Sequence, residues 1–473
     1  MPAHQVVIHW FRRDLRLTDN PALLHAARSA AGVIPLYILS DWKKHHDWTG
    51  PARQHFLCGS LASLAKNLEA IGSRLSLRSG TAEAVLEKLI HETGASAVFF
   101  NRDYDPFGRA AESGVRALCA RLGVACHDHK DRVLHEPEEA LTGAGGPYRV
   151  YTPYSRAWLA LEKPRPEGRV KALGPAPALP SLPLPSLAWW QLPECTAAIP
   201  EPGEKAARQR MKTFIESRVL HDYKPRRDVP EGVTTSRLGQ DLRFGLISIR
   251  ELHSRCQEAM AADSSPQARL SIETYIKELV WREFYLAILW HYPGVFEEEF
   301  SPDFRGLHWP GTDAHFQAWC QGRTGFPIVD AGIRQLLATG FMHNRLRMIT
   351  AMFLTKDLHC DWRLGESFFM RHLVDGENAS NNGGWQWSAG TGADAAPYFR
   401  IQNPWTQSKR HDPQARYIQT WVPELRGLPA DLLLDPPKDG RPVAPGYPAP
   451  IVDHAAERDR TLALFARHKE QRR

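Results

Sequence analysis

Short apolar runs alternate with amphipathic stretches over the first 131 residues. Apolar runs bounded by polar loops are typical of buried strands, and apolar residues spaced three and four apart indicate helices. Strands that alternate with helices form a parallel sheet covered on both faces. We therefore expect an α/β domain with a Rossmann-like parallel sheet at 1–131. The expected strands are 5–10, 33–39, 75–77, 97–100 and one beginning at 124, and the expected helices are 21–30, 50–71, 82–93 and 112–122.

The pattern changes twice after this domain. Residues 163–203 are rich in proline and lack periodicity, which is typical of a linker that follows the surface. We place an interdomain connector at 132–203. From 204 to 473 apolar residues recur at helical spacing, and no segment alternates like a strand. The sequence therefore predicts an all-α C-terminal domain over 204–473.

Two phosphate-binding motifs are missing from the sequence. No GxGxxG follows the first expected strand and no GxxxxGK[ST] occurs anywhere, so a Rossmann dinucleotide site or a P-loop is unsupported. The loop Asn101–Asp105 follows the expected strand 97–100, at an edge where parallel sheets bind ligands. It is either an ordinary polar loop or part of a small-molecule pocket.

Composition narrows the class of protein. The 473 residues are 43% hydrophobic and 24% charged, as in ordinary globular proteins. A formal net charge of +6 permits a nucleic-acid partner without pointing to one. Seven cysteines without a CxxC pair favour reduced thiols and argue against a disulfide framework or a metal site. With neither a signal peptide nor an apolar run of ~18 residues, we expect a cytoplasmic protein.

The stretch 340–400 combines indoles with many polar groups. Trp362, Trp385 and Trp387 suggest the middle of a core, whereas the polar side chains need hydrogen-bond partners if they are buried. A helical core with a few satisfied polar groups is one interpretation. A buried polar ligand surrounded by indoles explains the mixture better. The polar residues are His343, Asn344, Arg345, Arg347, Asp375, Glu377, Asn381 and Asn382.

Two shorter groups of residues could also bind a ligand. Thr235 and Ser236, next to Arg237, could grip a phosphate at a helix start, or they could simply cap that helix. Glu278 shares a helix face with Trp281, as it would at the wall of a cavity. The structural alternative for Glu278 is an ion pair with Arg282, one helical turn along the chain.

The helix predicted after 343 offers a third group. Asn344, Arg347 and Met348 would share one face, and Asp375 could pair with one of the arginines in a structural role. Indoles are oxidisable, so a row of them could pass an electron outward in hops, although core packing explains any single indole. The candidate row is Trp309, Trp362 and Trp385.

Together these segments resemble the DNA photolyase and cryptochrome family, most of all the class I photolyases that repair cyclobutane pyrimidine dimers. The resemblance covers nearly the whole chain and rests on HWFRRDLRLTDNPAL, RRDVPEGVTTSRL, KELVWREFY, TGFPIVDAGIRQL, GFMHNRLRMITAMFLTKDLHCDW and DGENASNNGGWQWSAGTGADAAPYFRIQNPWTQSKRHD. It implies an α/β antenna domain, a connector and a helical domain that binds bent FAD. It also implies light-driven repair, in which excited reduced FAD lends an electron while the dimer's ring opens.

By position, the resemblance implies the residues that would hold FAD. Asn381 would face flavin N5, where its amide oxygen accepts a hydrogen bond but the group cannot readily donate a proton. Plant-type cryptochromes carry Asp there, so Asn381 favours repair over signalling. The implied FAD-binding set is Tyr223, Thr235, Ser236, Arg237, Leu238, Gly239, Tyr275, Arg347, Asp375, Gly376, Glu377 and Asn381. The implied electron-transfer triad, from flavin to surface, is Trp385, Trp362 and Trp309.

The resemblance also implies a pocket for a flipped-out dimer and a surface for UV-damaged DNA. Glu278 would hydrogen-bond a thymine carbonyl, which requires a protonated carboxyl, so we expect its pKa to be raised. Phosphate contacts should make binding salt-dependent. The pocket residues are Glu278, Trp281, Asn344, Arg345, Met348 and Trp387. The DNA contacts are Arg227, Glu278, Trp281, Arg282, Asn344, Arg345, Arg400 and Gln407.

Some positions depart from the family pattern. Glu377 stands where Asp is commoner, and Ser380 stands where Ala is usual. The Asn-Glu pair that binds methenyltetrahydrofolate in the best-known bacterial members appears here as Phe107-Gly108, and 105–109 looks more like the deazaflavin-binding type. A deazaflavin, another flavin or no antenna are all open.

Two other functions are compatible with an FAD-binding chain of this kind. One is a cryptochrome-like blue-light photoreceptor without repair activity, and the other is an FAD electron-transfer protein that does not act on DNA. Glu278, Trp281, Asn344, Met348 and Asn381 favour repair over the photoreceptor, and preferential binding of dimer-containing DNA would distinguish repair from electron transfer without DNA. We expect the protein to act as a monomer.

Overall fold

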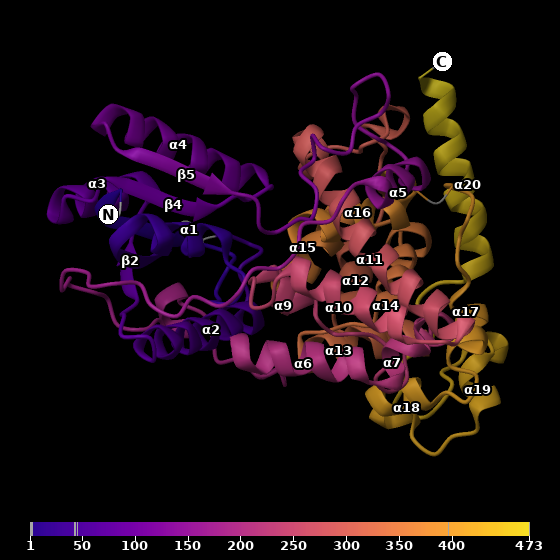
Figure 1. The fold of residues 1–473 in the computed structure, drawn as a ribbon. Coiled ribbons are helices and arrows are strands. Elements are labelled where there is room, and N and C mark those ends of the chain that lie inside the picture. Colours follow the sequence, from indigo (N-terminus) through magenta and orange to yellow (C-terminus); the bar gives the residue numbers. More distant parts are fainter. Residues whose placement is uncertain (1–2, 42–43, 45, 396, 473) are drawn as a thin grey trace.

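The computed structural model describes residues 3–41, 44, 46–395 and 397–472, which form an α/β part followed by a helical part (Figure 1). The described part of the α/β region contains a five-stranded sheet in the order β3-β2-β1-β4-β5, with every neighbouring pair parallel. This confirms the predicted fold class. The strands are β1 (His4–Phe11), β2 (Ala30–Leu39), β3 (Ser76–Ser79), β4 (Ala97–Asn101) and β5 (Ala125–His129).

Helices cover both faces of this sheet because alternate side chains of each strand point to opposite sides. In β1, Val7 and Phe11 pack with α1 (Pro21–Ser29) and α2 (Pro51–Glu69). Ile8 and Trp10 pack on the other face, in a separate apolar cluster. That cluster is closed by α3 (Ala82–Thr93) and α4 (Pro106–Leu122).

Two elements begin earlier than the sequence pattern predicted. The helix expected from residue 112 begins at Pro106, because Asp105 caps it by accepting a hydrogen bond from the Gly108 amide at 2.8 Å. Strand β2 begins at Ala30 rather than residue 33, because His4 of β1 already pairs with Ala30. Both elements begin with polar or small residues, so the apolar periodicity did not reveal where they start.

The stretch 132–203 is bound to the α/β domain along much of its length. Its backbone pairs with two strands: the Val33 amide donates to the Leu173 carbonyl at 2.9 Å, and the Leu182 amide donates to the Leu77 carbonyl at 2.9 Å. Figure 1 shows this segment passing beside β2 and α2. It also contributes one α-helix, α5 (Tyr151–Ala160), which packs against the helical part.

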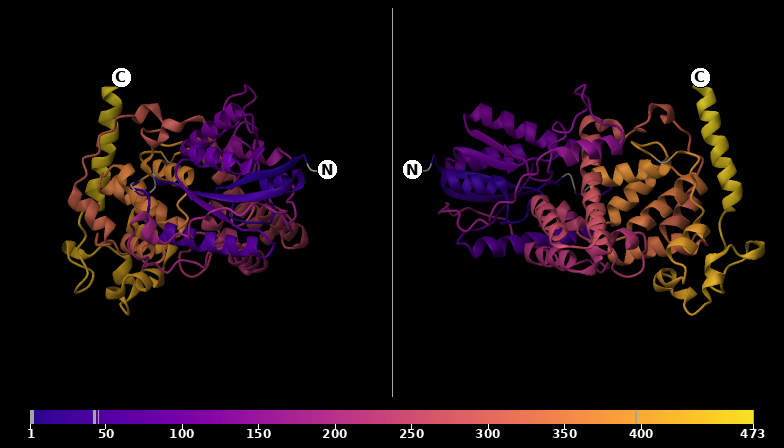
Figure 2. Two further views of the ribbon diagram at one scale, coloured as in Figure 1. Left: turned by 90° about the vertical axis from the view of Figure 1, so that its left-hand side faces the viewer. Right: turned by 45° about the vertical axis from the view of Figure 1, so that its right-hand side comes forward.

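The region 204–473 is helical in its described residues, as predicted. Figure 2 shows these helices gathered into one body, with the chain ends at opposite extremes of the molecule. Its α-helices are α6 (Glu204–Glu216), α7 (Arg218–His221), α8 (Tyr223–Arg226), α9 (Gly239–Arg243), α10 (Ile249–Ala262), α11 (Pro266–His291), α12 (Asp313–Cys320), α13 (Pro327–Thr339), α14 (Asn344–Met352), α15 (Trp362–His372), α16 (Asn378–Ala389), α17 (Pro404–His411), α18 (Arg416–Trp421), α19 (Ala430–Leu434) and α20 (His454–Gln471). Within the described ranges, no helix is long and apolar enough to cross a membrane.

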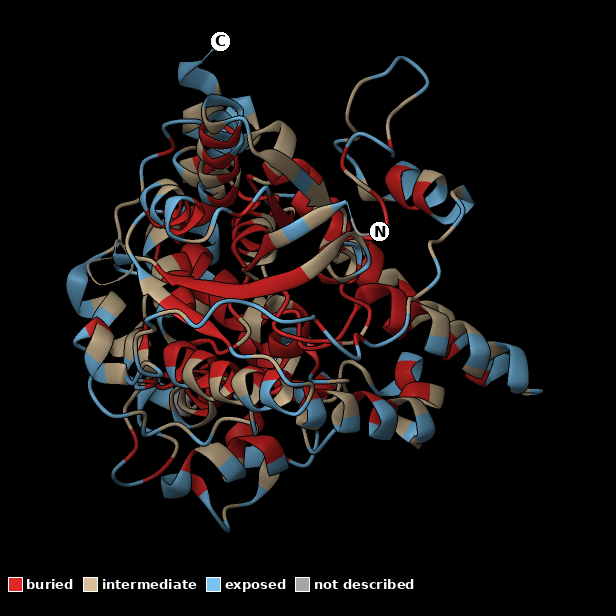
Figure 3. Cartoon of the chain, turned by 60° about the vertical axis from the view of Figure 1, so that its left-hand side comes forward, coloured by how far each residue is buried: buried red, intermediate tan, exposed pale blue. Residues whose placement is uncertain are grey.

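The long helix α11 joins the two parts. One apolar cluster runs from the sheet face through α2 and α10 into α11. Figure 3 shows that buried residues are concentrated on the strands and helices inside the molecule. On α11 the buried Glu283 carboxylate accepts three hydrogen bonds from the connector region. They come from the Leu134 amide at 2.6 Å, the His135 amide at 3.2 Å and the Trp158 indole at 2.6 Å. A buried carboxylate with three donors fixes α11 against the connector.

The C-terminal helix α20 packs against a π-helical turn, Phe353–Asp357, that follows α14. Lys356 of this turn is buried; its ammonium donates to the Ala389 carbonyl at 2.6 Å and lies 3.8 Å from the ring centre of Phe465. Burial lowers the pKa of Lys356 to about 7. The next residue, Asp357, pairs with His454 at 2.5 Å. These contacts connect α20 to the carboxyl end of α16.

Candidate functional site

A cavity of about 520 Å³ opens between α11, α14 and α16. This volume is in the usual range for small-molecule and cofactor sites. The structure brings twenty of the predicted site residues to its lining. They are Tyr223, Arg227, Thr235, Ser236, Leu238, Gly239, Tyr275, Glu278, Trp281, Arg282, Asn344, Arg345, Arg347, Met348, Asp375, Gly376, Glu377, Asn381, Trp385 and Trp387.

Helix α11 forms one wall of this cavity. Tyr275, Glu278, Arg282 and Tyr285 are spaced by three and four residues, so they share one face of the helix, and all four line the cavity. Tyr285 was not predicted, although its position four residues after Trp281 is a signal that could have found it. Helical spacing therefore explains how one element delivers so many groups to the site.

Glu278 does not form the predicted structural pair with Arg282. Its carboxylate pairs with the Arg227 guanidinium, while Arg282 donates to the Arg132 carbonyl at 2.7 Å, so the alternative Glu278–Arg282 pair is wrong. Burial raises the pKa of Glu278 above its ordinary value, and the charge of Arg227 acts in the opposite direction. The effect of burial is the larger, so the site favours the neutral form of the carboxyl even with Arg227 beside it.

Helix α14 forms a second wall, and ion pairs orient its arginines. Arg345 donates to Asp228 at 2.7 Å. Arg347 binds both carboxylate oxygens of Asp375, at 2.9 and 3.1 Å, which confirms the predicted pairing of Asp375 with an arginine of this group. The Asn344 amide lies 4.0 Å from the sulfur of Met348, so these two side chains sit together on the helix as expected.

Glu377 is the N-cap of α16, where its carboxylate accepts hydrogen bonds from the Ala379 and Ser380 amides at 3.1 and 3.2 Å. The other carboxylate oxygen pairs with Arg132 at 3.3 Å and Arg13 at 3.5 Å. Despite burial, these arginines lower the pKa of Glu377. The charged carboxylate of Glu377 therefore lies between Arg13 of the α/β domain and Arg132 of the connector.

One turn along α16, Asn381 lines the cavity with a fixed amide. Its nitrogen donates to the Glu366 carbonyl at 3.1 Å, which leaves the amide oxygen as the acceptor available to a ligand. The neighbouring Asn382 donates to the Glu366 carboxyl at 2.9 Å. Burial raises the pKa of that carboxyl to about 8. The orientation of Asn381 is thus set from behind by α15.

The segment before α9 approaches the cavity from the third side. Leu238, not Thr235 or Ser236, occupies the N-cap of α9, and no side chain caps this helix, so the capping alternative is wrong. A Cβ at Gly239 would lie 2.8 Å from a carboxylate oxygen of Asp375, so only glycine allows this approach. The side chains of Thr235 and Ser236 and the backbone of Gly239 therefore line the cavity beside the Asp375–Arg347 pair.

Five predicted residues lie outside the cavity lining. Arg237 is exposed, with its guanidinium 4.7 Å from the ring centre of Phe341. Trp362 is buried and donates to Glu299 at 3.2 Å, while Trp309 is half-buried near Phe465. The other two, Arg400 and Gln407, line an open pocket of about 490 Å³ that adjoins the cavity and shares Arg345, Met348 and Trp387 with it.

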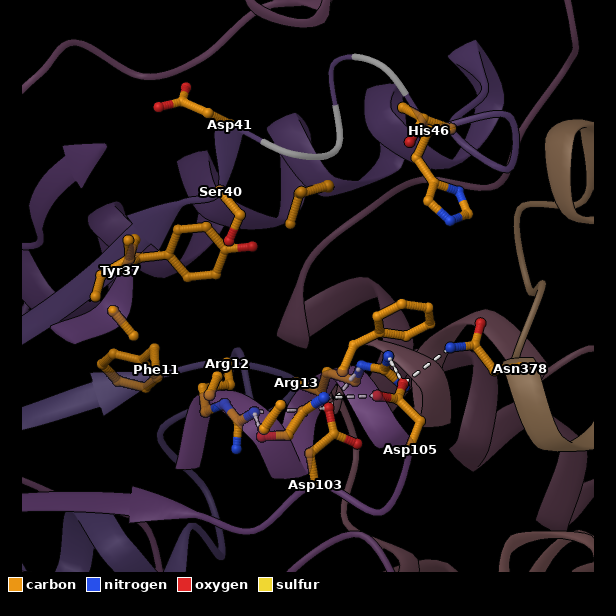
Figure 4. A pocket seen from close by; sticks show the side chains of 18 of the residues that line it. Phe11, Arg12, Arg13, Tyr37, Ser40, Asp41, His46, Asp103, Asp105 and Asn378 are labelled. Atoms are coloured by element: carbon orange, nitrogen blue, oxygen red, sulfur yellow. Dashed lines mark hydrogen bonds and ion pairs between the residues drawn. The ribbon is translucent and has the colours of Figure 1, made fainter. Parts of the chain in front are cut away.

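A second cavity, of about 670 Å³, lies mainly in the α/β domain (Figure 4). Aromatic side chains such as Tyr37 line one side, and Arg13, Asp103 and Asp105 form a charged group on the other. Arg13 binds Asp105 at 2.5 Å and Asp103 at 3.2 Å. The loop Asn101–Asp105 therefore contributes to a pocket, which decides between its two interpretations. Sequence analysis had not identified Arg13 or Tyr37.

The two cavities are separated by the segment 375–378. Asp375, Gly376 and Glu377 line the first cavity, and Asn378 lines the second, where it donates to Asp105 at 2.9 Å. From the second cavity, Arg243 donates to the Gly376 carbonyl. The same short stretch is thus a wall of both sites. Within the described residues, no three His, Cys, Asp or Glu side chains are placed to hold a metal ion.

Family models match most of this chain. The model described as DNA photolyase matches residues 7–173, and the model described as the FAD binding domain of DNA photolyase matches residues 275–467. The chain is 41% identical to a deoxyribodipyrimidine photo-lyase of Agrobacterium fabrum, over 98% of each chain. It is 40% identical to one of Halobacterium salinarum, over 97% of this chain and 98% of the relative.

Solved structures of similar proteins share the whole fold. A bacterial class III photolyase from Agrobacterium tumefaciens superposes with a TM-score of 0.91 at 39% identity, over 99% of this chain and 98% of the other. An archaeal photolyase from Sulfolobus tokodaii with two FAD molecules gives 0.84 at 30% identity, over 98% and 100%. A Synechocystis cryptochrome gives 0.89 at 26% identity, over 98% and 99%. The predicted class I assignment is not confirmed by these similarities.

Proposed function

Because this chain belongs to the DNA photolyase family, we propose that the cavity between α11, α14 and α16 holds FAD and receives a flipped-out cyclobutane pyrimidine dimer. The chain is an FAD-dependent deoxyribodipyrimidine photo-lyase that repairs UV-damaged DNA in the light. When bound and reduced, FAD supplies the electron that opens the dimer's ring after light is absorbed. The observation that supports this proposal is that one cavity is lined by Glu278, Trp281, Asn344, Met348 and Asn381.

The lining suits the parts of an FAD molecule. Thr235, Ser236 and the open backbone at Gly239 provide hydrogen-bond donors for phosphates. The amide oxygen of Asn381 provides an acceptor for a flavin N–H. The Trp385 indole, which lines the cavity, has a buried Nε1 without a hydrogen-bond partner in the described part of the chain. Asp375 and Arg347 would fix the remaining polar edge.

The dimer would lie against α11, α14 and α16, which contribute both apolar and polar side chains to the cavity. Trp281, Met348 and Trp387 give flat, apolar contacts that exclude water from the ring being opened. Glu278 would donate a hydrogen bond to a pyrimidine carbonyl, and burial already favours the protonated carboxyl needed for this. Arg227, which now holds Glu278, would turn toward a DNA phosphate.

The adjoining open pocket would hold the DNA strand. Arg400 and Gln407 lie there beside Arg345, which lines both hollows. Guanidinium and amide groups at this rim can bind phosphates without reading the bases. Trp385, Trp362 and Trp309 would pass electrons from the protein surface to the flavin; Trp385 lines the cavity, and Trp309 is half-buried. We further propose that the protein acts as a cytoplasmic monomer.

The second cavity would hold an antenna chromophore of the deazaflavin or flavin type. A glutamate cannot replace Gly108 without displacing its neighbours, because a Cβ there would lie 2.5 Å from the Cβ of Asp103. This disfavours the folate-binding pattern with Asn-Glu at 107–108. Tyr37, Trp10 and Phe107 offer aromatic faces for a planar ring. Release of the chromophore by denaturation, followed by chromatography against flavin, deazaflavin and folate standards, identifies it or shows that none is bound.

The first test is repair itself. The purified protein is illuminated with blue light beside a thymine-dimer oligonucleotide under reducing conditions, and restored thymine absorbance is measured. Light-dependent restoration is expected, and a flavin that photoreduces while the dimer stays intact would instead support the photoreceptor. If the protein binds damaged DNA no more tightly than undamaged DNA, the result would favour an FAD electron-transfer protein that does not act on DNA.

A substitution of Glu278 tests its role. Glu278→Gln keeps a hydrogen-bond donor that cannot ionise, so we expect repair to persist and to lose its dependence on the protonation of residue 278. Glu278→Ala should slow repair roughly tenfold, the effect of losing one hydrogen bond of about 1 to 1.5 kcal/mol. Equal repair by Glu278→Ala and the wild type, or an ordinary pKa for Glu278 with substrate bound, would contradict this role.

A further inference from the structure

The connector places an aromatic ring directly on one wall of the main cavity. Tyr151, the first residue of α5, stacks on Trp281 with ring centroids 3.6 Å apart and ring planes 3° apart. Trp281 lines the cavity, whereas Tyr151 does not. The phenol therefore backs the indole from outside the cavity.

One hydrogen bond holds Tyr151 in this position, in addition to the stack on Trp281. Its hydroxyl donates to the Lys277 carbonyl at 2.9 Å, the carbonyl that an α-helix pairs with the amide of residue 281. Burial, reinforced by the nearby charge of Glu278, raises the pKa of Tyr151, so the hydroxyl stays protonated and continues to donate.

The other rings around Trp281 belong to its own helix. Phe284 meets it edge-on and Tyr285 at a tilt, each with a centroid distance of 5.6 Å. Because Phe284 and Tyr285 lie on the same helix as Trp281, they move with it when α11 rotates. They also do not prevent the Trp281 indole from changing to a rotamer that points toward solvent. The Tyr151 ring comes from another element, so it fixes the plane of Trp281 relative to the rest of the site.

We propose that Tyr151 is a positioning residue of the dimer pocket, because its stack holds the Trp281 indole in the plane against which a flipped-out dimer packs. The inference rests on the proposed function of the cavity. A ring that is already immobilised loses less rotational freedom when the dimer binds, so the stack should improve affinity for damaged DNA. It should leave undamaged DNA, which does not enter the pocket, unaffected. The residue acts through Trp281 and contacts neither FAD nor the dimer.

The test separates binding from repair. Tyr151→Leu removes the planar ring, and we expect roughly fivefold weaker binding to a thymine-dimer oligonucleotide, in line with the worth of an aromatic pair. Binding to undamaged DNA and the repair rate at saturating damaged DNA should stay within about twofold of wild type. Tyr151→Phe keeps the stack and should restore affinity. Tyr151→Met, which keeps apolar volume without a planar face, gives the same readout if the leucine variant does not fold.

Tyr148→Leu is the matched control. Tyr148 lies on the same segment and is half-buried, but its ring contacts Tyr154 at 6.1 Å rather than Trp281. Wild-type affinity of the control, together with weaker binding by Tyr151→Leu, supports the inference. Unchanged affinity of Tyr151→Leu for damaged DNA, or an equal loss in the control, overturns it. Failure of the wild type to repair any dimer would instead reject the proposed function, whatever Tyr151 does.

Discussion

Replacement of Lys356 by methionine should remove a pH dependence of stability. Lys356 is 1% exposed, and burial lowers the pKa of its ammonium from 10.5 to about 7. Between pH 7 and 9 the unfolded chain therefore binds a proton that the folded chain has released. Stability must rise with pH in this range. A folded pKa of about 7 predicts a gain of roughly 2 kcal/mol between pH 7 and 9 from this residue alone.

The assay is urea unfolding at pH 6, 7, 8 and 9 for the wild type and Lys356→Met. Glu366, whose pKa burial raises to about 8, loses stability over the same range, so the difference between the two proteins is the readout. We expect that difference to change by roughly 2 kcal/mol from pH 7 to 9. At pH 7 the variant should be at least as stable, because a thioether of similar length carries no buried charge.

An exposed lysine provides the control for this measurement. Lys205→Met, on the outside of α6, removes the same charge at the surface and should follow the wild-type pH profile. Parallel profiles for wild type and Lys356→Met would refute the reasoning, because they would show that this ammonium is not released in the folded state over this range.

Two further changes test the domain junction and the DNA rim. Glu283→Ala leaves the Leu134 amide, the His135 amide and the Trp158 indole without their buried acceptor, so it should cost roughly 3 to 6 kcal/mol in urea unfolding, with Glu283→Gln in between; equal stability of all three proteins would contradict this. Arg400→Gln should weaken binding to damaged and undamaged DNA alike and reduce the slope of log affinity against log salt by about one, and an unchanged slope would place Arg400 away from the phosphates.

The sequence predicted the elements whose patterns are local. Alternating strands and helices, the helical C-terminal region and the shared face of Glu278 and Trp281 all follow from periodicities that the fold obeys. Motif resemblance then named most of the cavity lining. Helix α4 was predicted six residues short, because its first turn is polar and its start is defined by the Asp105 cap rather than by apolar spacing.

Contacts between distant segments could not be predicted in this way. Arg227 rather than Arg282 pairs with Glu278, although Arg282 is only one helical turn away. The partners of Glu377 are Arg13 in the α/β domain and Arg132 at the start of the connector. Helical spacing describes one element at a time, so it contains no information about which chain segments meet across an interface. The sequence alone does not explain why residue 377 is a glutamate, whereas its ion pairs with these two arginines do.

The shared wall at 375–378 limits how this protein can diverge. A substitution at 377 that reshapes the first cavity also changes a partner of Arg13, which lines the second cavity, so the two cavities cannot change shape independently. Changes to the second cavity that leave the first one intact are therefore expected at residues remote from this segment, such as those near Tyr37 (Figure 4). For an engineer, that remote side is where a new ligand can be introduced into the second cavity without disturbing the first.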